Sequence, residues 1–134
     1  MIPSSSIVRA RLTVGRGPLA RALAGRLVMS IGAETGLPID RLGEAALIAE
    51  RIADLCSDGH AGGCFELTVR AEDHLIELRA GPLGPGDGQR LLSADAHGSS
   101  GPVMAALATH ATIRRGRDGD ETLVLTVEQP DSPG

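Results

Sequence analysis

The sequence predicts an α+β fold, a two-layer sandwich in which about three helices cover one face of a mainly antiparallel sheet of four or five strands. Three observations support this. Short segments with alternating apolar residues, typical of half-buried strands, occur near both ends of the chain and in its middle. Apolar residues at helical spacing fall between them. Short polar turns join two pairs of these segments, which favours hairpins. Other two-layer sandwiches, ferredoxin-like ones included, share this pattern.

The expected elements follow the order β-α-α-β-β-loop-α-β-β. Residues 7–14 alternate as a strand, and a helix follows in which apolar residues repeat at spacing four. A second helix, with Asp40 as its N-cap, runs to about residue 56. The remaining segments are a hairpin over 65–80, a Gly/Pro loop over 81–88, a short turn or helix over 89–92, a helix over 103–110 and a hairpin over 111–128. Residues expected to be buried beneath the helices are Leu19, Leu23, Leu27, Ala46, Ala49, Ile52 and Leu107.

Composition limits the class of protein. The 134 residues fit a single domain over 1–134, with an ordered core at about 7–128. The net charge of −4 and a single aromatic residue, Phe65, argue against a nucleic-acid binder. No apolar run approaches the roughly 20 residues that cross a bilayer, and the start lacks the apolar core of a signal peptide. We therefore expect no membrane partner, a cytoplasmic protein and reduced thiols at Cys56 and Cys64.

The predicted second helix carries two carboxylates four residues apart, Glu50 and Asp54, which places them on one helix face. This helix resembles the one that bears Glu and Asn at the same spacing in the GHKL (histidine kinase-like) ATPase superfamily, and most closely the anti-sigma-factor serine/threonine kinases. There the Glu is the catalytic base, and the Asn helps to hold magnesium at the triphosphate. The resemblance implies that Glu50 is the base and that Asp54 is a magnesium and nucleotide ligand. The alternative is that both are solvated residues on a polar helix face.

The end of the predicted strand over 74–80 resembles the family's adenine-binding segment less well. The family places an Asp there that accepts a hydrogen bond from the adenine amino group, and Ala80 stands at that position in this chain. Alanine has no acceptor. Gly84 and Gly86 retain the glycine-rich character of the nucleotide loop, although a wide surface turn explains them equally well. Asp87 replaces the missing acceptor only if the loop folds back.

A third segment precedes the predicted helix over 103–110. Gly98, Ser99, Ser100 and Gly101 resemble the family's turn whose backbone N–H groups receive the phosphates. Pro102 follows this turn and removes one donor. The closing hairpin also resembles the family's last strand, so the resemblance covers about residues 7–128.

Taken together, the resemblance implies the Bergerat (histidine kinase-like ATPase) fold and an anti-sigma regulatory factor-like protein that controls transcription through protein partners. The implied partners are a sigma factor, an anti-anti-sigma protein or both, and family members often form homodimers. ATP and Mg²⁺ are the implied cofactors, with binding expected to be weak or lost because the motifs are degraded, and serine kinase activity goes with them. The alternative is a non-enzymatic protein-interaction module on the same fold.

A zinc-binding regulator is the third hypothesis, with Cys56, His60 and Cys64 as ligands and His74 nearby. Structural zinc sites usually place paired ligands two to four residues apart. Cys56 falls on the apolar stripe of its predicted helix, where a thiol behaves as a small apolar side chain. We therefore expect no zinc in the purified protein.

Overall fold

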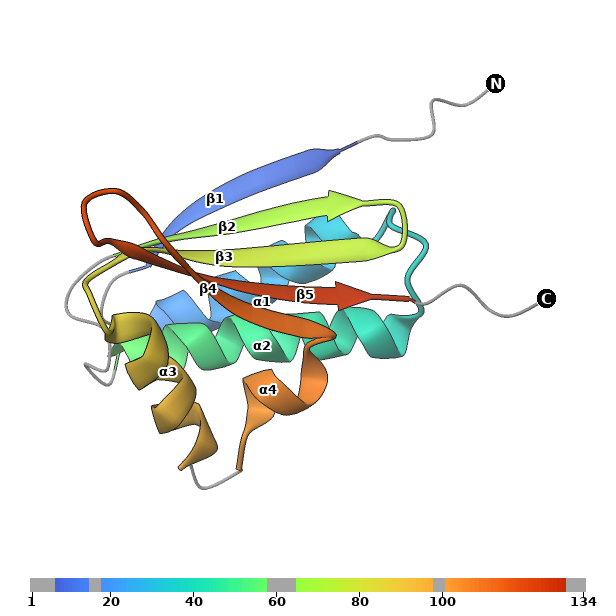
Figure 1. The fold of residues 1–134 in the computed structure, drawn as a ribbon. Coiled ribbons are helices and arrows are strands. Elements are labelled where there is room, and N and C mark those ends of the chain that lie inside the picture. Colours follow the sequence, from blue (N-terminus) through green and yellow to red (C-terminus); the bar gives the residue numbers. More distant parts are fainter. Residues whose placement is uncertain (1–6, 15–17, 58–64, 98–100, 130–134) are drawn as a thin grey trace.

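The computed structural model confirms the α+β two-layer architecture (Figure 1). It describes residues 7–14, 18–57, 65–97 and 101–129. Within these ranges the elements follow the order β-α-α-β-β-α-α-β-β, which adds one helix to the predicted order. All the described helices lie on one side of the sheet, and none of them covers its other face (Figure 1).

The sheet has five strands in the order β1-β2-β3-β5-β4, and every neighbouring pair is antiparallel. Both hairpins join strands that are adjacent in sequence, as the polar turns predict. The third strand continues past its predicted end at Ala80 to Leu83, with a shift in register between these two residues. The strands are β1 (Val8–Val14), β2 (Phe65–Glu72), β3 (Leu75–Leu83), β4 (His110–Arg115) and β5 (Glu121–Glu128).

The helices follow the sheet from one edge to the other. The first contacts β1 and β2, the second β3 and β5, and the last two β5 and β4. The prediction at residues 89–92 is too short, because a full helix forms there. The last helix ends at Leu107 rather than at residue 110, where β4 begins. The helices are α1 (Pro18–Gly32), α2 (Ile39–Ser57), α3 (Asp87–Ala96) and α4 (Val103–Leu107).

Aliphatic side chains fill the space between the two layers. The strands contribute every second residue, as their alternation predicts. The prediction that Ala46, Ala49 and Ile52 are buried is confirmed, whereas Leu27 and Leu107 are half-buried at the margin of the core. The largest fully buried side chains are Ile48, Ile52, Leu67, Ile76, Leu78, Leu91, Met104, Leu123 and Leu125.

The predicted burial of Leu19 and Leu23 is wrong. Their side chains are 73% and 48% exposed. The helix instead turns a stripe of smaller residues inward, including Ala24 and Val28. On its side toward α2 the helix approaches closely: a Cβ atom built on Gly25 would lie 2.6 Å from the Glu50 carboxylate. Both stripes repeat at spacing four, so periodicity alone does not distinguish between them.

Candidate functional site

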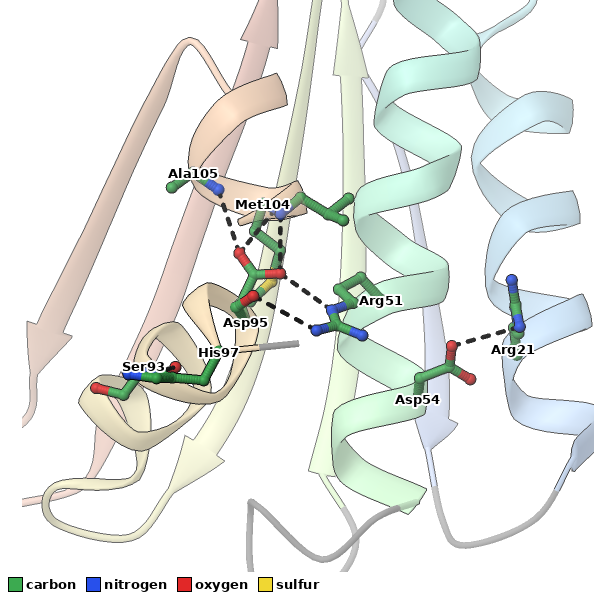
Figure 2. A network of polar contacts seen from close by, with 9 residues as sticks. Arg21, Arg51, Asp54, Ser93, Asp95, His97, Met104 and Ala105 are labelled. Atoms are coloured by element: carbon green, nitrogen blue, oxygen red, sulfur yellow. Dashed lines mark hydrogen bonds and ion pairs between the residues drawn. The ribbon is translucent and has the colours of Figure 1, made fainter. Parts of the chain in front are cut away.

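The two carboxylates predicted on α2 lie together on one helix face, where an arginine of α1 reaches both. The Nε atom of Arg21 lies 3.4 Å from Glu50 Oε1, and its Nη1 atom lies 3.5 Å from Asp54 Oδ2. Figure 2 shows Asp54 pointing from α2 toward Arg21 on α1. The guanidinium thus supplies positive charge at the place where the resemblance implies a magnesium ion.

This contact between α1 and α2 is solvent-accessible. The Arg21 side chain is 58% exposed, and surface ion pairs of this kind contribute about 0–1 kcal/mol. Glu50 and Asp54 are thus two carboxylates on one helix face, paired with the same arginine of α1. Within the described ranges, no group of three or more His, Cys, Asp or Glu side chains is arranged to hold a metal ion.

A third acidic residue lies at the N-terminus of α4, the helix that follows the turn predicted to receive the phosphates. Asp95, near the end of α3, is fully buried. Its carboxylate accepts hydrogen bonds from the backbone N–H groups of Val103 (3.1 Å), Met104 (2.9 Å) and Ala105 (3.5 Å). These N–H groups belong to the first turn of α4 and have no acceptor within the helix. The helix dipole also favours negative charge at this end. The Asp95 carboxylate supplies both the acceptor oxygens and the negative charge (Figure 2).

An arginine from α2 completes this arrangement. The Nε atom of Arg51 donates to Asp95 Oδ1 at 3.0 Å, and its side chain is 19% exposed. Figure 2 shows Arg51 pointing from α2 toward Asp95, whereas Asp54 points in the other direction, toward Arg21. We call this set the Asp95 clamp: the Asp95 carboxylate, the Arg51 guanidinium and the first three N–H groups of α4. It ties three helices together around one buried carboxylate.

The Asp95 clamp was not predicted from the sequence, although the sequence does indicate that Asp95 is buried. Leu91 and Asp95 are four residues apart, so any helix that extends beyond residue 92 places both on one stripe. Leu91 is fully buried, as is Asp95. A carboxylate on a buried stripe requires charged or N–H partners. Nothing in the spacing identifies Arg51 as that partner, because the contact spans 44 positions of the chain.

The glycine-rich segment after β3 forms a turn tied by its own aspartate. Gly86 has φ +84°, in the left-handed region that favours glycine. Asp87 Oδ2 accepts from the Gly84 N–H at 3.1 Å, and Oδ1 is paired with Arg90 Nη1 at 3.0 Å. Both carboxylate oxygens of Asp87 are therefore engaged within this turn and the first turn of α3. The fold-back toward a base, which the sequence left open, is not the arrangement found.

Ala80, at the position of the family's adenine-binding aspartate, is fully buried in β3. It lies opposite Leu123 of β5, in the apolar layer between sheet and helices. An acceptor at this position would have to be accommodated within that layer.

Glu121 fastens the start of α3 to the sheet. Its Oε1 atom accepts from the Gly88 N–H at 2.9 Å, and its Oε2 atom is paired with Arg115 Nε at 3.3 Å. Hydrogen bonds from the Gly86 and Gly88 backbone hold the pKa of Glu121 below its usual value, and Arg115 acts in the same direction against the opposing effect of burial. The glycine turn is thus held from both ends by carboxylates of the chain.

The other predicted residues divide between described and undescribed segments. Gly98, Ser99 and Ser100 lie outside the described residues, and Gly101 immediately precedes Pro102 and α4 with φ +75°. Of the zinc candidates, Cys56 is buried on α2, as its position on the apolar stripe predicts, and His74 is exposed in the β2–β3 turn. His60 and Cys64 fall outside the described ranges.

Comparison with known proteins gives no match for this chain, either among protein-family models or among curated proteins. Its functional interpretation therefore depends on the resemblance of its motifs and on the contacts described above. In the parts of the chain that the structure describes, no helix is long and apolar enough to cross a membrane.

Proposed function

We propose that this chain is an anti-sigma regulatory factor-like protein on the histidine kinase-like ATPase fold. It controls transcription in the cytoplasm through protein partners, a sigma factor or an anti-anti-sigma protein. It acts as a protein-interaction module that has lost tight nucleotide binding. The order of elements and the resemblance of the α2 motif support the class of protein. The Asp95 clamp carries the second half of the proposal.

The clamp matters because phosphate binding and the Asp95 carboxylate compete for the same donors. The Met104 N–H at 2.9 Å and the Val103 N–H at 3.1 Å are already satisfied by a buried anion. A phosphate brought to these groups would meet the Asp95 carboxylate at close range, and like charges in a poorly solvated site repel strongly. Displacing Asp95 would leave a buried carboxylate without its partners, which is costly.

The adenine end of the site supports the same conclusion. The resemblance assigns base recognition to a carboxylate at position 80, where Ala80 is buried among apolar side chains. Asp87 is engaged within its own turn. The interaction that fixes the base in the family therefore has no substitute among these residues. An unpaired polar group of the base costs about 1–3 kcal/mol, or roughly one to two orders of magnitude in affinity.

Calorimetric titration of Mg-ATP and Mg-GTP tests the proposal. We expect the natural chain to bind neither nucleotide with a Kd below about 1 mM, which corresponds to about −4 kcal/mol. Asp54→Asn is the informative variant, because it supplies the family's residue at a half-buried position and removes a charge beside the nucleotide. We expect it to remain without affinity, since it leaves the Asp95 clamp intact. Micromolar, adenine-selective binding by either protein would refute the loss of nucleotide binding.

The partner half of the proposal is tested separately, with the sigma factor encoded nearest to this gene. We expect the purified chain to reduce transcription by polymerase carrying that sigma factor, with no requirement for ATP. Unchanged transcription at equimolar sigma factor and with excess chain would contradict it. An inhibition that appears only with ATP would contradict the nucleotide-independent mechanism.

A serine kinase is the second candidate function. The observation that favours it is the half-buried pair Glu50 and Asp54 on one face of α2, which among the described residues is paired with a surface arginine. A kinase would transfer the terminal phosphoryl group of ATP to an antagonist protein, and Glu50→Gln would abolish the transfer. Incorporation of labelled phosphate that this variant loses would establish the kinase.

A further inference from the structure

One edge of the molecule carries apolar side chains that the fold leaves uncovered. Leu19 and Leu23 of α1 are 73% and 48% exposed, and Val8 of β1 is 47% exposed. We call these three residues the β1 edge strip. Val8 lies on the core side of the sheet, because it is paired with the buried Ala71 of β2. The apolar layer of the sandwich is therefore open at this edge.

Helix geometry places both leucines at the margin of the helical layer. Arg21 and Gly25 face α2, where they meet Glu50. At 100° per residue, Leu23 lies about 160° from each of them and Leu19 lies about 40° from Leu23, so both project from the flank of α1 that faces away from α2. α1 itself contacts β1 and β2, at the β1 end of the sheet. The leucines thus lie where one more strand beside β1 would cover them.

β1 is the terminal strand of the described sheet, so its outer edge presents backbone N–H and C=O groups outside the ladder. Its side chains alternate in character. Val8, Ala10 and Leu12 face the core, and the intervening residues are two exposed arginines, Arg9 and Arg11. A strand that pairs with β1 would therefore meet apolar groups on one face and positive charge on the other.

This charge pattern disfavours a second copy of the chain. In an antiparallel β1–β1 pair whose apolar faces both point toward the core, Arg9 and Arg11 of one copy lie opposite or diagonal to those of the other in every register centred on residues 8–12. Like charges across neighbouring strands are destabilising. Arg70 of β2 lies opposite Arg9 but is already paired with Glu72 at 2.9 Å, so the charge available to an incoming strand is that of Arg9 and Arg11. Carboxylates on the incoming strand would instead be attracted.

We infer that the β1 edge is the docking site for an extended segment of a partner protein, with apolar residues at alternate positions and Asp or Glu between them. The segment adds a strand beside β1 through main-chain hydrogen bonds. Its apolar side chains cover Leu19, Leu23 and Val8, and its carboxylates face Arg9 and Arg11. This inference rests on the proposed function in one respect, because it identifies the surface that binds the protein partner.

Synthetic ten-residue peptides test this chemistry on the full chain. The first alternates Val and Glu and is N-methylated on one edge, so that it cannot stack on itself; the second replaces Glu by Lys; the third is N-methylated on both edges. We expect the Val/Glu peptide to shift the backbone amides of Val8–Val14 and the methyl signals of Leu19 and Leu23 in NMR titrations. It should bind at least tenfold more tightly than the other two peptides. Equal binding of the Val/Glu and Val/Lys peptides, or no binding of either, would overturn the inference.

Charge reversal supplies the matched variants. Arg9→Glu with Arg11→Glu should exchange the preference, so that the Val/Lys peptide binds about tenfold more tightly than the Val/Glu peptide. The control is Arg114→Glu with Arg117→Glu, two exposed arginines at the opposite edge of the sheet, and it should leave both affinities unchanged. Loss of binding in the control would show nonspecific charge attraction and refute the site.

A second copy is the rival occupant, and analytical ultracentrifugation identifies it. We expect the natural chain and the Leu23→Ser variant to have the same oligomeric state. Dimers that Leu23→Ser dissociates would overturn the inference in favour of self-association. The transcription assay distinguishes this surface from the proposed function. If the variant Arg9→Glu with Arg11→Glu still inhibits transcription, the proposed function stands and the β1 edge is not the surface that carries it.

Discussion

Replacing Asp95 by alanine is the most informative perturbation of this protein, because one side chain joins α2, α3 and α4. The carboxylate is fully buried and accepts from three backbone N–H groups and from Arg51. Asp95→Ala removes all four contacts at once. It leaves the first turn of α4 without a cap and Arg51 without its anion.

The size of the effect follows from these contacts. Breaking a buried ion pair by removing one partner costs about 3–5 kcal/mol, and loss of an N-terminal cap alone costs about 0.5–2 kcal/mol. The Ala105 contact, at 3.5 Å, adds little. Arg51 keeps 19% of its side-chain surface in water, which limits the cost of leaving it unpaired. We expect Asp95→Ala to lower the free energy of unfolding by about 3–4 kcal/mol, and Asp95→Asn by about half as much.

Urea denaturation followed by far-UV circular dichroism measures this loss, since the chain has no Trp or Tyr for fluorescence. With a slope of about 1.5 kcal/mol/M, the unfolding midpoint of Asp95→Ala should fall by about 2–3 M. The control is Asp54→Ala, which removes a carboxylate from an exposed pair with Arg21 and should cost less than about 1 kcal/mol.

Comparable losses in the two variants would refute this reasoning, because they would show that Asp95 contributes no more than a surface charge. A double-mutant cycle with Arg51→Ala provides the second check. The two side chains should couple by about 1–3 kcal/mol, whereas additive losses would show that the ion pair does not contribute.

Three further predictions concern other parts of the fold. Ala80→Asp should destabilise the protein by about 3 kcal/mol or more in urea denaturation, because it places a carboxylate in the apolar layer. Gly32→Ala should cost about 1–2 kcal/mol, since its Cβ would lie 2.6 Å from Leu42 Cδ2 and 2.7 Å from Ile76 Cδ1. Gly25→Ala is its matched contrast and should cost less than about 0.5 kcal/mol, because it displaces only the flexible end of Glu50. In the fold the pKa of Glu121 is lowered, so its stabilising contribution is present at neutral pH and is lost as the pH falls below about 4.3. Unfolding of Glu121→Gln should accordingly depend less on pH between 5 and 3.

The predictions that succeeded rest on patterns that local backbone geometry imposes. Alternation along β2, β3 and β5 identifies which side of each strand is buried, and short polar turns identify the antiparallel pairs. The spacing of Glu50 and Asp54 places them on one face of α2, as found. Each of these inferences concerns residues of one element, or of two elements joined by a short turn, where the chain itself fixes the geometry.

The predictions that failed, and the contacts that were missed, depend on segments far apart in the sequence. The inward-facing stripe of α1 depends on how this helix packs against α2, where Gly25 lies close to Glu50 of the other helix. Arg51 meets Asp95 across 44 positions, and Arg21 meets Glu50 across 29. Spacing within one element carries no information on such pairs, because helix packing selects them.

The polar contacts of this molecule are distributed unevenly, and that distribution bears on the choice between catalysis and protein binding. Around α3 and α4, the strongest donors and acceptors are already paired with one another, through Asp95 on one side and Glu121 on the other. A small anionic ligand has to displace such pairs before it can bind. At the β1 edge, apolar surface and arginine charge lie exposed side by side, and a partner strand can bind there without breaking a buried contact. For a module that acts through proteins, the β1 edge is therefore the less costly surface to use.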